Sequence, residues 1–63
     1  MKILITGSHG QLGQDLTDLC RKSGHEVLSC GSHDLDITDY NAVLDFVSNS
    51  HPDLIINCAA YNA

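Results

Sequence analysis

The sequence has few basic residues, no tryptophan, one proline and no long apolar run. Three Lys and Arg residues stand against eight Asp and Glu residues, so the formal net charge is -5 at pH 7. This balance disfavours nucleic acid and anionic membranes, and neither is expected as a partner. No apolar run approaches the roughly 20 residues of a membrane span, and no basic segment leads into an apolar one at the amino terminus. A cytoplasmic location is therefore expected.

The cysteines and histidines do not form a recognisable ligand pattern. Cys20, Cys30 and Cys58 are odd in number and widely spaced, with no C-x-x-C pair. A disulfide framework and a structural zinc site are therefore not predicted, and reduced, mostly buried thiols are expected. The four histidines also lack ligand spacing, so no metal site is predicted.

Apolar patterning predicts alternating strands and helices. Continuous apolar runs rich in β-branched residues indicate strands covered on both faces, whereas apolar residues repeating every three or four positions indicate helices. Asp39 or Thr38 can cap the second helix, and Pro52 stands past its end. The expected elements are strands at 2–6, 26–30 and 53–57, with one helix over 11–23 and another between Asp39 and Pro52.

The order β-α-β-α-β predicts an α/β fold of the Rossmann-like kind. Right-handed crossovers would give three parallel strands in spatial order 3-2-1, with both helices on one side. This is half of a doubly wound sheet, so the chain is expected to be a fragment of a larger sheet. The outer edge of the first strand would then be open, which predicts either a longer parent protein or self-association through that edge.

Three glycines separate the first strand from the first helix in "ITGSHGQLG", residues 5–13. Unpaired amides at a helix start, together with the helix dipole, form an anion site. Gly7 would permit a tight turn, Gly10 would let the backbone approach a pyrophosphate, and Gly13 would let the helix lie close to the strand. A glycine-rich turn without a ligand is the alternative, but the strand before and the helix after it favour dinucleotide binding.

"TGSHGQLG" resembles the T-G-x-x-G-x-x-G turn of the extended short-chain dehydrogenases and reductases. With "GHEV", "LDITD" and "HPDLIINCAAY", essentially all 63 residues resemble the amino-terminal portion of the dTDP-4-dehydrorhamnose reductases. Those oxidoreductases use a nicotinamide cofactor to reduce a nucleotide-linked 4-keto sugar during dTDP-rhamnose synthesis. The resemblance implies that residues 1–63 form the amino-terminal half of an NAD(P)-binding Rossmann domain, with the catalytic and substrate-binding portions absent. The sugar nucleotide would then be a partner of the full-length parent alone.

The resemblance also implies roles for individual residues. The amides of Gly10, Gln11 and Leu12 would face the pyrophosphate, while the Leu12 side chain is expected in the core. Further contacts are implied for the adenine, at Asp36 and Ile37, and for the path toward the nicotinamide ribose, at Ala59, Ala60 and Tyr61. The alternatives are a turn or cap carboxylate at position 36 and helix–sheet packing of the two alanines.

The residues after the second strand bear on the choice of cofactor. Gly31 stands where many relatives carry an Asp that accepts from the ribose 2'-hydroxyl of NAD. Without that carboxylate, Ser32 and His33 would be free to donate to a 2'-phosphate, which favours NADP(H) over NAD(H). An exposed loop position is the alternative for His33. A protonated His9 would favour phosphate, whereas a neutral one would crowd it.

No catalytic residue is predicted within the chain. The superfamily resembled here uses a Tyr-x-x-x-Lys pair, but the residue four positions after Tyr40 is Leu44, and Tyr61 has too little chain beyond it to test. Lys2 and Lys22 precede both tyrosines. The chain alone is therefore expected to be inactive. Two alternatives stay open: a non-catalytic regulatory subunit similar to that of methionine adenosyltransferase, and another nucleotide-sugar epimerase or dehydratase.

Overall fold

The structure, a computed structural model, describes residues 1–58 and contains the alternating elements that the sequence predicts. Strand β1 pairs in parallel with both β2 and β3. Asp39 caps the second helix by accepting a hydrogen bond from Ala42 N at 3.1 Å. The α/β, Rossmann-like class is therefore confirmed. The elements are β1 (Lys2–Thr6), α1 (Gln11–Lys22), β2 (Glu26–Cys30), α2 (Tyr40–Ser50) and β3 (Leu54–Asn57).

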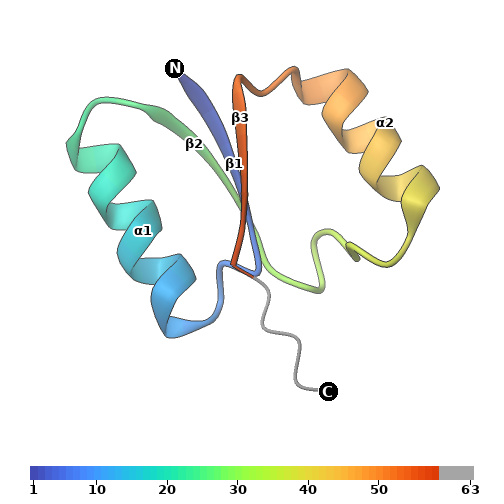
Figure 1. Cartoon of the computed structure of the whole chain (residues 1–63), viewed down its shortest axis with the longest axis horizontal. Coiled ribbons are helices and arrows are strands. Elements are labelled where there is room, and N and C mark those ends of the chain that lie inside the picture. The colour runs from blue at the N-terminus through green and yellow to red at the C-terminus, as the bar shows by residue number, and fades with distance from the viewer. Residues whose placement is uncertain (59–63) are drawn as a thin grey trace.

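The strand order is β2-β1-β3, so the predicted order 3-2-1 was wrong in placing the first strand at an edge. The chain leaves β2, crosses through α2 and returns on the far side of β1. The crossover through α1 runs from β1 to β2, and the crossover through α2 runs in the opposite direction, from β2 past β1 to β3. A right-handed path for both therefore requires the two helices to lie on opposite faces of the sheet. Figure 1 shows α1 and α2 on opposite sides of the sheet, so the expectation of both helices on one side was also wrong.

The central position of β1 agrees with its continuous apolar sequence. Its side chains alternate between the two faces, and four of its five residues are buried. Leu4 joins Cys30 and Leu35 in a core on the α2 side. Ile3 and Ile5, on the other face, are also buried. The half-buried residues packed against the α2-side core are Leu28, Ala42, Val43, Phe46 and Val47.

Helix α1 faces the sheet with small residues, while Leu16 and Cys20 are half-buried. The buried residues of the helix are Gly13 and Thr17, whereas the Leu12 side chain is 68% exposed. The expectation that Leu12 lies in the core was therefore wrong. Because position 13 is a glycine, this face of the helix approaches the preceding turn more closely than a face with a larger side chain there could.

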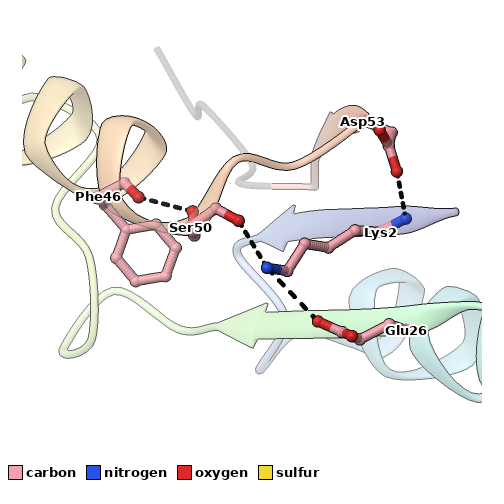
Figure 2. A network of polar contacts seen from close by, with 5 residues as sticks. All are labelled: Lys2, Glu26, Phe46, Ser50 and Asp53. Atoms are coloured by element: carbon pink, nitrogen blue, oxygen red, sulfur yellow. Dashed lines mark hydrogen bonds and ion pairs between the residues drawn. The ribbon is translucent and has the colours of Figure 1, made fainter.

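Lys2 links three elements at the end of the sheet opposite the glycine-rich turn (Figure 2). Its Nζ donates to the Ser50 carbonyl at 2.6 Å and lies 3.6 Å from the Glu26 carboxylate. Its backbone N donates to Asp53 Oδ2 at 2.7 Å, and the Ser50 hydroxyl donates to the Phe46 carbonyl at 2.6 Å. The ammonium thus stabilises the carboxyl end of α2 and connects it to β1 and β2.

Candidate functional site

The glycine-rich turn, residues 7–10, lies where β1 ends and α1 begins. Gly7 adopts a left-handed conformation with φ 67°, which glycine tolerates and which reverses the chain direction after the strand. Ser8 N donates to the Cys30 carbonyl at 3.2 Å and so joins the turn to the end of β2. The turn is therefore at the carboxyl edge of the parallel strands, where open α/β sheets bind their ligands.

The start of α1 retains backbone donors without protein acceptors. Its cap residue, Gly10, has no side chain to accept a hydrogen bond, and its own N–H makes only a long contact of 3.5 Å to the Gly7 carbonyl. The first bond of the helix runs from Gln14 N to the Gly10 carbonyl at 3.0 Å. Within residues 1–58, the amides of Gln11 and Leu12 donate to no protein group. These donors and the helix dipole together favour an anion here.

Gly13 brings the helix directly against the turn. A Cβ at this position would lie 2.6 Å from Ser8 Cα and 2.7 Å from the Gly7 carbonyl oxygen. Thr17, one turn further on, is buried and donates its hydroxyl to the Gly13 carbonyl at 2.7 Å. The absence of a side chain at position 13 therefore determines how close the helix start lies to the end of β1.

A carboxylate lies beside Gly31, although position 31 itself carries none. Asp34 Oδ2 accepts from Gly31 N at 2.9 Å, and the Gly31 carbonyl accepts from Asp34 N at 3.0 Å and Leu35 N at 3.1 Å. Burial, and secondarily the negative charge of Asp34, raise the pKa of the Cys30 thiol. The sequence analysis did not identify Asp34 as a site residue. The only hint in the sequence is that an Asp side chain in a loop can accept a hydrogen bond from the backbone of a nearby residue, here Gly31.

The His9 ring covers Gly31 from the side of the glycine-rich turn. A Cβ at position 31 would lie 2.5 Å from His9 Cε1, so the ring fills the space that a side chain would need. His9 Nε2 lies 4.0 Å from Asp34 Oδ2, with 70% of the His9 side chain and 57% of the Asp34 side chain exposed. The imidazole and the carboxylate therefore face solvent together beside the end of β2.

The loop that follows contains the other predicted contacts after β2. Ser32 and His33 are exposed. Asp36 Oδ1 accepts from the Thr38 hydroxyl at 2.6 Å and from Thr38 N at 2.9 Å, and these bonds lower the pKa of the Asp36 carboxyl. The turn-carboxylate alternative for Asp36 is thus observed, although its second oxygen makes no bond with the described residues. Ile37 is half-buried.

The remaining predicted contacts, Ala59, Ala60 and Tyr61, lie outside the described residues. A cavity of about 240 Å³ lies beside the glycine-rich turn, between α1 and β2. Its lining is polar and includes Ser8, His9 and Arg21. Across residues 1–58, no cluster of three or more metal-binding side chains occurs, and no helix is long and apolar enough to cross a membrane.

The chain is similar to known proteins over essentially its whole length. The profile of a family described as RmlD substrate binding domain matches residues 1–63. The dTDP-4-dehydrorhamnose reductase of Mycolicibacterium smegmatis is 48% identical over 95% of this chain and 18% of that protein. The dTDP-4-dehydrorhamnose reductase of Streptomyces griseus is 43% identical over 95% of this chain and 20% of that protein. A solved dTDP-4-dehydrorhamnose reductase from Clostridium acetobutylicum matches with a TM-score of 0.92 and 44% identity, over 100% of this chain and 22% of that one.

The chain thus spans about a fifth of the length of these relatives. The resemblance to the dTDP-4-dehydrorhamnose reductases, first noted in the glycine-rich turn and the segments after it, is confirmed over the whole chain. The chain belongs to the RmlD substrate binding domain family.

Proposed function

We propose that this chain is the amino-terminal, cofactor-binding part of an oxidoreductase that reduces a dTDP-linked 4-keto sugar. The observation that carries the proposal is the start of α1 at the carboxyl edge of the sheet, where the Gln11 and Leu12 amides donate to no group of residues 1–58. A diphosphate is the part of a nicotinamide dinucleotide that such donors bind best. The reductases among its relatives support the same activity for the whole protein.

The proposed contacts follow the sheet edge. Gly7 and Gly13 shape the turn, and Gly10 leaves room for the diphosphate next to the free amides. With the exposed His9 ring rotated away from Gly31, the adenosine half would extend over Gly31 toward Asp36. The other contacts proposed on the adenosine side are Ser32, His33 and Ile37, and those toward the nicotinamide ribose are Ala59, Ala60 and Tyr61.

The expectation of NADP(H) over NAD(H) had two grounds: position 31 carries no carboxylate, and Ser32 and His33 can donate to a 2'-phosphate. The first ground is weakened, because Asp34 Oδ2 lies 2.9 Å from the Gly31 amide nitrogen. A comparison of the dissociation constants for NADPH and NADH tests the preference.

Chemistry would require the rest of the parent protein. Since no Tyr-x-x-x-Lys pair occurs in the 63 residues, the chain would bind and orient the cofactor, while the proton donor and the sugar-nucleotide site would lie elsewhere in the parent. We keep the assignment of residues 1–63 as half of an NAD(P)-binding domain, and a cytoplasmic location, as parts of this proposal.

Titration with NADH and NADPH, followed by amide chemical shifts, tests the proposal. The amides of Gly10, Gln11 and Leu12 should shift in a saturable way, whereas the amide of Gly24, at the opposite end of α1, should not. A well-dispersed spectrum in which none of the first three amides responds to either dinucleotide would refute the cofactor role.

A further inference from the structure

We propose that Asp34 is the residue that discriminates against a 2'-phosphate on the bound dinucleotide, so that the site favours NAD(H). This inference rests on the proposed function, since it concerns the adenosine end of the same site. It reverses the preference expected from the sequence, because the loop supplies the carboxylate that position 31 lacks.

The loop after β2 holds the Asp34 carboxylate in a defined place. Gly31 donates its N–H to Asp34 Oδ2 at 2.9 Å and accepts from Asp34 N at 3.0 Å, so the side chain and the backbone of Asp34 are both tied to the end of β2. One carboxylate oxygen accepts the Gly31 bond, and 57% of the side chain remains exposed. The carboxylate therefore retains acceptor capacity for a ligand hydroxyl.

The same end of β2 is next to the proposed diphosphate site. Ser8 N donates to the Cys30 carbonyl at 3.2 Å, and the His9 ring covers Gly31, so the glycine-rich turn and the Asp34 loop are in direct contact. A dinucleotide whose diphosphate lies at the start of α1 would place its adenosine ribose over this junction. The ribose hydroxyls would then approach Asp34.

The charges around Asp34 determine whether the site binds a dinucleotide with a 2'-phosphate more weakly or more tightly than one without it. A ribose hydroxyl donates to a carboxylate, whereas a 2'-phosphate brings a second negative group to the same place and is repelled. Side chains near Asp34 that can carry a positive charge include His9, with Nε2 at 4.0 Å from Asp34 Oδ2, and Arg21, which lines the cavity next to His9. His33, which directly precedes Asp34 in the exposed loop, is another. These groups would reduce the repulsion, and solvent screening limits it to about tenfold in affinity.

Asp34→Asn tests this directly, because the amide oxygen can still accept from Gly31 N while the negative charge is lost. Dissociation constants for NADH and NADPH are measured on the protein, on this variant and on a matched control, Asp45→Asn. Asp45 lies exposed on α2, so its substitution changes the net charge equally and leaves the loop unchanged. Asp34→Ser is a second neutral variant, should the Asn variant fold poorly.

The protein should bind NADH more tightly than NADPH, and Asp34→Asn should raise the relative affinity for NADPH by about tenfold. Asp45→Asn should leave the ratio of the two affinities unchanged. If both dinucleotides bind and the ratio is the same in all variants, Asp34 has no discriminating role while the proposed function stands. If neither dinucleotide binds the folded protein, the proposed function itself fails, and this inference with it.

Discussion

Gly13 and Gly31 both lack room for a methyl group, but different atoms fill the space. At Gly13 the nearest atoms are backbone, Ser8 Cα at 2.6 Å and the Gly7 carbonyl oxygen at 2.7 Å. At Gly31 the nearest atoms belong to the exposed His9 ring, which can rotate away. The two glycines are equally visible in the sequence, yet only the first is required for packing.

Gly13→Ala should destabilise the fold by about 1–3 kcal/mol, because backbone must move and the helix propensity of alanine recovers less than this amount. Gly31→Ala should cost less than about 1 kcal/mol, since only an exposed side chain is displaced. Urea unfolding of the two variants measures both values. Equal losses in the two would contradict the distinction between backbone and side-chain neighbours.

Gln11→Pro removes one of the free amides and should preserve the fold. Proline suits the first position of a helix, and Gly10, with φ -74° and ψ 166°, already has the extended conformation that a residue before proline requires. Loss of one donor to a phosphate should weaken dinucleotide binding about tenfold. Gln11→Ala, which retains the N–H, is the control, and similar affinities for the two variants would argue against a role for this amide.

Asp36 offers a pH-dependent test of the loop. Its bonds from Thr38 lower the pKa of the folded-state carboxyl below its ordinary value, so the stability that they contribute is present above the unfolded-state pKa and is lost as pH falls through the folded-state pKa. Thr38→Val removes the hydroxyl and should raise the pKa of Asp36 toward its ordinary value. The chemical shift of the Asp36 carboxyl carbon, followed against pH, measures this pKa. An unchanged midpoint in the variant would show that the Thr38 hydroxyl does not donate to Asp36.

At the scale of elements, most boundaries follow from local sequence. Helix α1 was predicted over 11–23 and spans Gln11–Lys22, and β3 was predicted over 53–57 and spans Leu54–Asn57. The exposure of Leu12 was not predicted, because an apolar pattern does not show how closely a face of small residues can pack. The strand order was not predicted either, because the pattern does not show on which side of β1 the crossover through α2 returns.

Lys2→Met should destabilise the chain by about 1 kcal/mol, since it removes the ammonium that bonds the Ser50 carbonyl and pairs with Glu26. The estimate is modest because the Lys2 side chain is 34% exposed and its charge is partly screened. Lys22→Met, in the exposed last turn of α1, is the matched control. Thermal unfolding compares them, and equal changes would mean that the network in Figure 2 adds no stability beyond net charge.

At the scale of the whole molecule, the described sheet has its edges at β2 and β3, whereas β1 is central. The β3 edge is the more apolar and exposed, since Ile55 is 50% exposed while Val27 and Leu28 of β2 are half-buried. An exposed apolar edge strand is prone to pairing with another chain. We therefore expect the 63-residue chain to self-associate through β3 when it is studied by itself.

Ile55→Lys should reduce that self-association, because a charge on an edge strand opposes pairing between chains. Sedimentation velocity over a concentration series measures the effect. Leu19→Lys places the same charge on the exposed face of α1 and should reduce association less. If the α1 variant is the more monomeric of the two, the contact lies on the helix instead of the strand.

The sequence by itself determined the elements, the α/β class and the position of the glycine-rich turn at a helix start, because these depend on local periodicity and backbone preferences. Only the tertiary structure decided that β1 is central, that Gly13 fixes the helix against the turn, and that Asp34 returns to Gly31. These outcomes depend on which side of β1 a crossover returns and on contacts between separate segments, which patterns along the chain do not encode.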